Sequence, residues 1–541
     1  METILDILET TEARCGDRPA VYDGQTRLTY RELGAAARRI GASLCGSVRR
    51  GEPVAILAEK SCAVLGCMYG VVYAGGFYVN INPEQPPERI RKILEVLQAR
   101  CVLTDAERRP QLEAAGYRGR TYSVEELFTG DADGGAAGAG DIPAAAAGAG
   151  DAAVDMPAAE VPAQLRAVRE QMRGTDPLYG VFTSGSTGTP KGIVVSHRAV
   201  IDFIGHFTEI FGITQEDVLG NQAPFDFDVS VKDLYSALFT GAEAVLIPRT
   251  YFSTPPRLLD YLCDSRVTVL VWAVSALCLV SGLKGLRYRV PEHVRLVMFS
   301  GEVMPVKHLT MWQDALPGAA FVNLYGPSEI TCNCTYYRIT RRFDKTEKIP
   351  IGTAFPGRTV FLADPEAQVP EDGAVFEPRL ITQPGEAGEL CVAGESLAEG
   401  YYRDPAQTAR RFVRCRMADG EVRRVYRTGD LACYGEDGLL YFAGRSDFQI
   451  KHMGHRLELE EIETNFMALD GVERAVCLFD EDRNRLVCWY TGTPAPGEVR
   501  GCLKERVPAY MIPSKIFRTE EMPLNKNGKI DRAFFRAQLH K

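Results

Sequence analysis

The sequence predicts an α/β fold in which a large N-terminal domain of doubly wound sheets with helices, residues 1–446, precedes a small α+β domain, residues 447–541. Short apolar runs alternate with amphipathic helical patterns up to about residue 430. This alternation is typical of largely parallel sheets, whose ligand clefts lie at the carboxyl ends of the strands. After Asp430 the pattern changes to short hairpin-like strands. A chain of 541 residues also has room for more than one domain.

Local signals predict the individual elements. Residues 28–44 place apolar side chains at helical spacing after Thr29, which predicts a helix opened by that residue. Residues 51–60 predict a short strand after a turn. The apolar run 267–283 contains hydroxyl groups and falls short of the roughly 20 residues that a membrane span needs. We therefore expect a buried strand that leads into a helix, and we expect a hairpin turn at residues 436–438.

Residues 131–162 break the alternating pattern. This stretch consists almost wholly of Ala, Gly, Asp and Pro, and it has too few large apolar side chains to order itself against chain entropy. We predict a loop insertion or flexible linker within the large domain.

Composition and charge exclude several classes of partner. The net charge of −9 and the lack of a long Lys/Arg block argue against nucleic acid binding, and no membrane span is expected. The N-terminus lacks a basic segment followed by an apolar core, so we expect no secretory signal and a cytoplasmic protein. The 15 cysteines include no C-x-x-C pair, which favours reduced and mostly packed thiols.

The segment 179–197, YGVFTSGSTGTPKGIVVSH, predicts a strand that runs into a loop of glycines and hydroxyl side chains. Glycines let the backbone approach an anion closely, hydroxyls donate hydrogen bonds and Lys191 adds positive charge. The spacing is not that of a Walker loop. The segment therefore indicates a phosphate-binding loop.

The text TSGSTGTPKG, residues 183–192, resembles the phosphate-loop signature of the adenylate-forming superfamily, which comprises amino-acid adenylation domains, acyl-CoA synthetases and luciferases. The remaining signatures of that superfamily follow in order. They are LTYREL (28), YAGGFYVNINPEQPPERI (73), FDFDVSVKDLY (225), NLYGPSE (323), GELCVAGESLAEGYY (388), YRTGD (426), GRSDFQIKHMGHRLELEEIE (444), PAYMIP (508) and LNKNGKIDR (524). The resemblance covers essentially the whole chain apart from the insertion.

This resemblance implies ATP and Mg²⁺ as cofactors and assigns roles to residues. Lys529 would bridge the substrate carboxylate and the nucleotide, Glu329 and Thr187 would hold Mg²⁺, and Asp447 would be the hinge of the C-terminal domain. Tyr325 would stack on adenine, Asp430 would accept from the ribose hydroxyls, and Arg445 would reach the ribose or phosphates. The full set of nucleotide-binding residues is Thr183, Ser184, Gly185, Ser186, Thr187, Gly188, Lys191, Gly301, Glu302, Asn323, Tyr325, Gly326, Asp430 and Arg445.

The FDFDVSVKD text indicates an amino-acid substrate. In the resembling amino-acid enzymes an aspartate here pairs with the substrate ammonium, and Asp228 fits that position better than Asp226. Lys232 is unusual because this position of the predicted substrate pocket is commonly aromatic or aliphatic. A side chain that points into the pocket would favour an Asp-like or Glu-like substrate, whereas one that points outward would leave a small, mildly polar pocket. The predicted lining is Asp228, Val229, Lys232, Val271, Met298, Ser300, Leu324, Cys332 and Asn333.

The printed sequence contains no phosphopantetheine-attachment text of the G-G-x-S kind. The resemblance therefore implies transfer of the activated amino acid to the thiol of a discrete acyl or peptidyl carrier protein. The overall sequence pattern is similar to that of D-alanine:carrier-protein ligases of teichoic acid modification, although Ser300 and Lys232 depart from it. An acyl-CoA synthetase for a non-amino acid and a non-catalytic nucleotide-binding scaffold are the alternatives.

Overall fold

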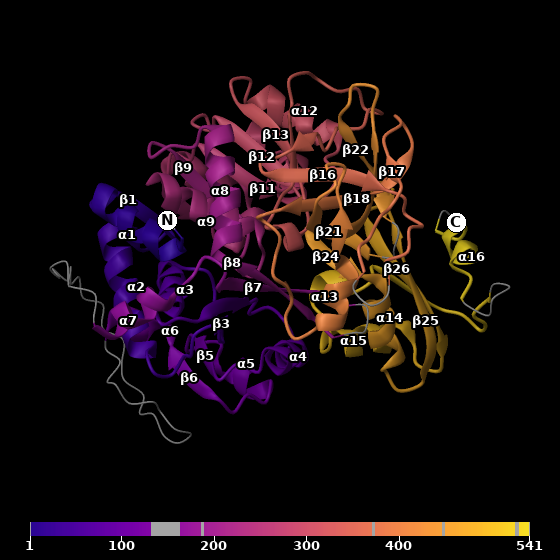
Figure 1. Ribbon diagram of the computed structural model, residues 1–541. Helices are drawn as coiled ribbons and strands as arrows, with labels where there is room; N and C mark the ends of the chain where they lie inside the picture. Colours follow the sequence, from indigo (N-terminus) through magenta and orange to yellow (C-terminus); the bar gives the residue numbers. More distant parts are fainter. Residues whose placement is uncertain are drawn as a thin grey trace.

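A computed structural model describes residues 2–130, 163–185, 189–370, 374–445, 449–524 and 530–539. The N-terminal elements lie at one end of the molecule and the C-terminal elements at the other (Figure 1). In the described part of the chain, three large sheets precede residue 446 and two small sheets follow it. The insertion predicted at 131–162 lies outside the described residues.

The first sheet is nine-stranded over the described ranges and has the order β15-β14-β13-β12-β11-β9-β10-β1-β2. Neighbours from β13 to β1 are parallel, while β2, β14 and β15 run antiparallel at the edges. The strands are β1 Pro19–Tyr22, β2 Arg27–Thr29, β9 Val218–Asn221, β10 Glu243–Leu246, β11 Val269–Ala273, β12 Leu296–Ser300, β13 Ala320–Tyr325, β14 Thr335–Arg338 and β15 Thr353–Ala354.

The second sheet, with seven strands among the residues described, has the order β19-β8-β7-β4-β3-β5-β6. It is parallel from β7 to β6, and β8 and β19 are its antiparallel edge. The strands are β3 Pro53–Leu57, β4 Phe77–Ile81, β5 Cys101–Thr104, β6 Arg120–Ser123, β7 Pro177–Thr183, β8 Lys191–Ser196 and β19 Gly400–Tyr401. The two sheets confirm the predicted α/β class.

Helix α9 lies between these two sheets. It packs on β9 and β11 of the first sheet, and its Tyr235 Oη lies 2.6 Å from Tyr78 Oη on β4 of the second. One apolar core runs through both sheets. The helices of this region are α1 Ile4–Cys15, α2 Tyr30–Leu44, α3 Cys62–Tyr73, α4 Pro87–Leu97, α5 Arg109–Ala114, α6 Val124–Thr129, α7 Ala163–Gln171, α8 His197–Phe211, α9 Val229–Thr240, α10 Pro255–Asp264, α11 Val274–Gly282, α12 Val306–Ala315 and α13 Pro405–Arg411.

Several local predictions are confirmed. Thr29 caps α2: its Oγ1 accepts from the Glu32 amide at 3.2 Å, and the Glu32 carboxylate accepts from the Thr29 amide at 2.7 Å. The apolar run 267–283 forms β11 followed by α11. None of the helices within the described ranges has both the length and the apolar character of a membrane span.

A third sheet corrects the prediction of alternating, largely parallel structure up to residue 430. In this sheet, which begins at Arg358, the neighbouring strands are antiparallel, in the order β17-β16-β18-β21-β20 with β22 on β21. These strands are β16 Arg358–Ala363, β17 Leu380–Ile381, β18 Ala387–Gly394, β20 Phe412–Arg416, β21 Val422–Tyr434 and β22 Leu440–Arg445. The predicted hairpin turn at 436–438 joins β21 to β22.

The C-terminal elements form a small α+β unit. A two-stranded hairpin, β23 Gln449–His452 and β24 His455–Glu458, precedes a three-stranded sheet of β25, β26 and β27. The remaining bounds are α14 Leu459–Met467, β25 Val472–Asp480, β26 Arg485–Gly492, α15 Pro496–Lys504, β27 Lys515–Arg518 and α16 Arg532–Arg536.

One cysteine pair departs from the prediction of reduced thiols. Cys477 on β25 and Cys488 on β26 form a disulfide, and the other cysteines are free. The two residues are directly opposite in the antiparallel register, with Cα atoms 4.2 Å apart. Register between strands cannot be read from the spacing of the two cysteines along the chain, so the sequence pattern missed the pair.

Candidate active site

The phosphate loop connects β7 to β8. Thr183 ends β7 and Lys191 begins β8, while Ser186, Thr187 and Gly188 lie outside the described residues. The Thr183 hydroxyl is buried and has no hydrogen-bond partner within the described structure. A Cβ on Gly185 would lie 2.0 Å from the Thr189 carbonyl oxygen, so only glycine fits this close approach.

The residues predicted to hold adenine and ribose lie together. Tyr325, at the end of β13, donates from its hydroxyl to the Asp430 carboxylate, and Arg445 forms an ion pair with the same carboxylate. The Lys451 ammonium lies 5.5 Å from the centroid of the Tyr325 ring. The antiparallel pairing of β21 with β22 places Asp430 opposite Arg445.

Glu329, the predicted magnesium ligand, is fully buried in the turn after β13. Its carboxylate accepts from the Tyr401 hydroxyl at 2.8 Å and pairs with Arg456 at 2.5 Å. Burial alone would raise the pKa of Glu329, but Arg456, Lys191 and the Tyr401 hydrogen bond lower it to about 2. The carboxylate is therefore ionised, and in this structure a guanidinium, that of Arg456, is its cationic partner.

Three more of the predicted nucleotide-binding residues, Glu302, Asn323 and Gly326, have identifiable contacts. Glu302 accepts from the Gly454 amide at 2.6 Å, and burial raises the pKa of Glu302. Asn323 donates from its side chain to the Pro350 carbonyl at 2.8 Å, which holds the neighbouring segment. Gly326 has a backbone position that no other residue would fit, because a Cβ there would lie 2.5 Å from Asn333 Cα.

The predicted substrate residues gather at the start of α9 and the ends of β11, β12 and β13. Asp228 and Lys232 are buried, and the Lys232 ammonium donates to Ser300 Oγ at 3.1 Å and Asn333 Oδ1 at 3.0 Å. Cys332 Sγ donates to the Asp228 carbonyl at 3.2 Å. The outward alternative for Lys232 is therefore wrong, since the side chain turns toward the predicted pocket. The apolar members of the set, all buried, are Val229, Val271, Met298 and Leu324.

The structure separates the two candidate aspartates. Burial raises the pKa of Asp228, while a hydrogen bond from Ser328 and the charge of Lys232 oppose that rise. Burial raises the pKa of Asp226 to about 7, and the charge of Glu59 adds to that rise, whereas Asn82 opposes it. Asp228 therefore lies among the predicted substrate residues, whereas Asp226 lies near Glu59 and Asn82, in the segments that follow β3 and β4.

Three further features were missed by the sequence analysis. Lys60 donates to three consecutive carbonyl oxygens, those of Asn221, Gln222 and Ala223, at 3.1, 3.0 and 3.3 Å. This contact fixes the loop that leads to Asp228, and no sequence signal marks Lys60. The other two features are the β23–β24 hairpin and Tyr401, which both contact Glu329. They lie within motifs that the sequence analysis lists, but the motifs alone assigned them no role.

The residues present fit a magnesium nucleotide. An ionised carboxylate at Glu329, an ammonium at Lys191 and a buried hydroxyl at Thr183 match the donors and acceptors that Mg²⁺ and phosphate oxygens need. Within the described residues, no group of three or more His, Cys, Asp or Glu side chains could hold a metal by itself. A site built from one carboxylate and phosphate oxygens is how Mg²⁺ is usually held.

Lys529 and Asp447 lie outside the described residues. The chain after Lys529 is anchored on the small domain, because Arg532 donates to the Cys477 carbonyl at 3.0 Å and pairs with Glu463 at 2.7 Å. Helix α16, which follows, lies at the edge of the molecule beside β25 (Figure 1).

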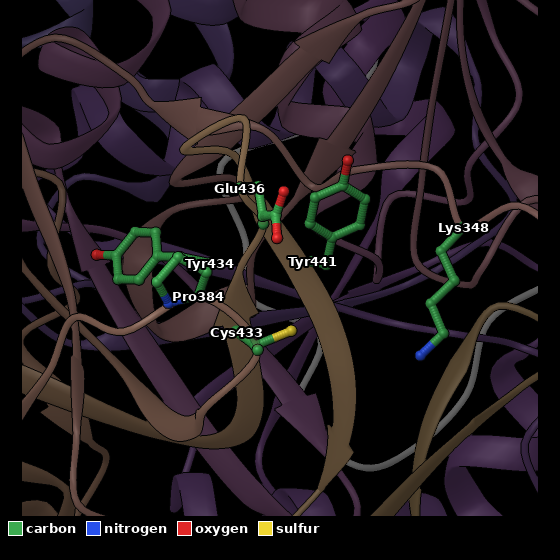
Figure 2. Close-up of a pocket in the computed structure, with 8 residues that line it drawn as sticks. Lys348, Pro384, Cys433, Tyr434, Glu436 and Tyr441 are labelled. Carbon is green, nitrogen blue, oxygen red and sulfur yellow. The ribbon is translucent and has the colours of Figure 1, made fainter.

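A separate hollow of about 350 Å³ lies on the third sheet. Its lining is Lys348, Pro384, Gly385, Cys433, Tyr434, Gly435, Glu436 and Tyr441, and Figure 2 shows these side chains around the β21–β22 turn. No predicted site residue contributes to it, so this hollow is distinct from the candidate active site.

The fold and the site define the class, an α/β protein with a buried carboxylate at Glu329 in the turn after β13. A family model described as AMP-binding enzyme matches residues 8–402, more than half of the chain. The chain belongs to the AMP-binding enzyme family.

Known proteins similar to the chain include large bacterial synthases. It is 32% identical over 537 residues to tyrocidine synthase 3 of Brevibacillus parabrevis, covering 97% of this chain and 7% of that protein. It is 28% identical over 540 residues to tyrocidine synthase 1 of the same organism, covering 98% of this chain and 44% of that protein. The chain thus spans less than half the length of these relatives.

Solved structures share the fold. The Vibrio cholerae adenylation domain AlmE, solved in complex with glycyl-adenosine-5′-phosphate, superposes with a TM-score of 0.79 at 22% identity and covers 99% of this chain and 98% of that one. PA1221, an NRPS protein with adenylation and PCP domains, superposes with a TM-score of 0.77 at 24% identity and covers 99% and 84%.

Proposed function

We propose that the chain uses ATP to adenylate an amino acid, releasing pyrophosphate, and then transfers the aminoacyl group to the phosphopantetheine thiol of a separate carrier protein. The observation that carries this proposal is the junction of two groups of residues in one loop. Cys332 Sγ donates to the backbone carbonyl of Asp228, the proposed ammonium ligand, at 3.2 Å, and Glu329, three residues earlier in the same loop, is the proposed magnesium ligand. The amino acid and the triphosphate would therefore meet beside residues 329–332.

In this proposal the chain's residues bind and orient the two reactants. Thr183 and Lys191 hold phosphate oxygens, and Tyr325 and Asp430 hold the nucleoside. Mg²⁺, when bound at Glu329, neutralises charge on the triphosphate. Asp228 holds the amine so that the substrate carboxylate faces the α-phosphate, and Lys529 offsets the charge that develops there. An acyl adenylate is reactive enough for a thiolate to displace AMP in the second step.

Lys232 favours an acidic side chain on the substrate, within the broader proposal of a small or acidic amino acid. An ammonium has three N–H donors, and Ser300 and Asn333 accept two of them. Burial lowers the pKa of Lys232, so a substrate carboxylate beside it would stabilise the charged form. A neutral substrate such as alanine would gain nothing from this buried ammonium.

Pyrophosphate exchange into ATP tests the first step. The panel contains Asp, Glu, Gly and both enantiomers of alanine, together with octanoate and benzoate. Exchange that is strongest with Asp or Glu supports the proposal, and exchange strongest with D-alanine would instead favour the D-alanine ligase. Exchange only with octanoate or benzoate would identify an acyl-CoA synthetase, and its absence with every acid would indicate a scaffold.

Carrier loading tests the second step. Support for a carrier partner comes from PA1221, which contains adenylation and PCP domains. We further propose that the reaction takes place in the cytoplasm, where ATP is supplied. A carrier protein bearing phosphopantetheine should gain the mass of the aminoacyl group, whereas the same carrier without the prosthetic group should not. Equal loading of free coenzyme A would contradict the proposed partner.

A further inference from the structure

Tyr179 lies on β7, the strand that leads into the phosphate loop, and its side chain carries an unpaired polar atom. The residue is 2% exposed, and its hydroxyl has no hydrogen-bond partner among the described residues. A buried hydroxyl without a partner is costly, because it has lost its bonds to water and gained none in return. We therefore expect a bound molecule to supply the missing partner.

The strand pairing places Tyr179 beside helix α9. Strands β4 and β7 are parallel, with Tyr78 opposite Tyr179, and the two rings stack with centroids 6.0 Å apart. The Tyr78 hydroxyl lies 2.6 Å from that of Tyr235 on α9. Tyr235 follows Lys232 by three residues and Asp228 by seven, so these side chains share one face of the helix. Tyr179 therefore lies next to the face of α9 that carries both proposed substrate charges.

The Tyr179 hydroxyl also lies near two of the predicted substrate residues. Burial raises the pKa of Tyr179 well above its ordinary value, and nearby Cys332 and Asp228 add to the rise. The hydroxyl therefore keeps its proton and is a hydrogen-bond donor. Cys332 and Asp228 are already joined to each other, because Cys332 Sγ donates to the Asp228 carbonyl at 3.2 Å.

Strand β7 connects this hydroxyl to the proposed phosphate site. Side chains alternate between the two faces of a strand, so Tyr179 and Thr183 lie on the same face of β7. The Thr183 hydroxyl is also buried without a partner in the described structure. In the proposed function Thr183 meets a phosphate oxygen. The second unpaired hydroxyl, four residues earlier, therefore lies on the amino-acid side of the same site.

Two donors near the proposed substrate are unused within the described residues. One is the Tyr179 hydroxyl. The other is the third N–H of the Lys232 ammonium, since two side-chain oxygens accept the first two. A side-chain carboxylate has two oxygens and can accept from both donors. Alanine has no side-chain acceptor and would leave both donors unpaired.

We propose that Tyr179 is a further substrate-selecting residue, whose hydroxyl donates a hydrogen bond to the side-chain carboxylate of an acidic amino acid. The inference rests on the proposed function. It adds a contact from the second sheet, which contributes none of the predicted pocket residues. Hydrogen bonds to a charged acceptor are among the stronger ones in proteins, so loss of this hydroxyl should affect acidic substrates and not neutral ones.

The variant Tyr179→Phe tests the contact, because it removes the hydroxyl and keeps the ring that stacks on Tyr78. In pyrophosphate exchange across the amino-acid panel, kcat/KM for Asp and Glu should fall roughly 10- to 100-fold relative to Gly and alanine. Calorimetric titration with L-aspartate and L-glutamate should show a matching rise in Kd. This second readout needs no turnover.

Tyr78→Phe is the matched control, because the Tyr78 hydroxyl already has a partner in the core. Tyr78→Phe should lower Tm and leave the ratio of kcat/KM values for acidic and neutral amino acids unchanged. Tyr179→Phe should instead leave Tm unchanged or raise it, since it removes a buried hydroxyl that has no partner within the described structure. The two variants thus separate substrate selection from stability.

Three results would overturn the proposal. The first is a Tyr179→Phe variant with the substrate preference and Kd values of the wild type, which would assign the hydroxyl to a pocket water. The second is a decrease in Tm as large as that of Tyr78→Phe, which would show a partner within the protein. The third is a wild type that binds neither acidic amino acid. Failure of the proposed function would instead appear as lack of pyrophosphate exchange with every acid, and the titrations would still report on Tyr179.

Discussion

Asp228 and Lys232 lie about one turn apart at the start of α9, and both are buried. Opposite charges in a buried site are costly unless each finds partners, and Ser300 and Asn333 provide them for Lys232. A substrate with both an ammonium and a side-chain carboxylate would match the two charges. At the scale of single residues, this pair is the basis of the proposed specificity.

Replacing Lys232 tests that basis. Lys232→Met removes the buried ammonium and keeps the length of an unbranched side chain, so kcat/KM for acidic amino acids should fall by roughly tenfold or more relative to small neutral ones. Pyrophosphate exchange across the amino-acid panel measures the change. Lys307→Met, at an exposed position of α12, is the control. An unchanged profile in Lys232→Met would contradict a role in selection.

His197 predicts a pH dependence of stability. Its imidazole is fully buried and accepts from the Ile4 amide at 3.1 Å, and burial lowers its pKa to about 4. Because the unfolded imidazole binds a proton near pH 6.5, stability is lost as pH falls from about 6.5 toward 4, by about 2 kcal/mol at pH 5.

The variant His197→Asn keeps an acceptor but cannot titrate in this range. We expect the decrease in Tm between pH 7 and pH 5 to be smaller in His197→Asn than in the wild type, as measured by thermal unfolding at both pH values. Equal decreases in the two proteins would show that His197 makes no contribution.

At the scale of elements, the loop between β13 and β14 depends on close backbone contact. A Cβ on Gly326 would lie 2.5 Å from Asn333 Cα and 2.8 Å from the Cys332 oxygen. Gly326→Ala should cost about 1–3 kcal/mol and should lower exchange activity, because it displaces the segment that bonds Lys232. Gly318→Ala, where a Cβ meets no atom within 4 Å, should leave both Tm and exchange unchanged. Similar Tm values in the two variants would refute this explanation.

Elements that depend on residues close in the sequence were predictable, whereas strand direction and long-range side-chain contacts were not. The Thr29 cap and the strand-to-helix run at 267–283 follow from side chains close in the sequence, and both are confirmed. Strand direction in the third sheet depends on partners far along the chain, so the antiparallel order was missed. The orientation of Lys232 depends on the rotation of α9, and the Arg456–Glu329 pair joins residues 127 positions apart. Neither contact has a local signal.

At the scale of the whole molecule, the two half-reactions should separate by mutation. Lys529→Ala should reduce adenylate formation about 100-fold while leaving transfer from preformed aminoacyl adenylate largely intact, because only the first step develops charge at the α-phosphate. Pyrophosphate exchange and carrier loading measure the two steps separately. Lys504→Ala, an exposed lysine of α15, is the control, and equal loss of both steps in Lys529→Ala would contradict the assigned role.

The placement of Arg456 and Glu458 beyond residue 402 bears on recombination between relatives. Arg456 pairs with Glu329, and Glu458 pairs with Lys191. A chimaera that takes its first 445 residues from this chain and the remainder from another family member would inherit Glu329 and Lys191 but receive a foreign hairpin. If the donor lacks either charge, the graft leaves a buried carboxylate or ammonium without its counter-ion. Compatible partners for domain exchange are therefore those whose hairpins carry the same two charges in the same order.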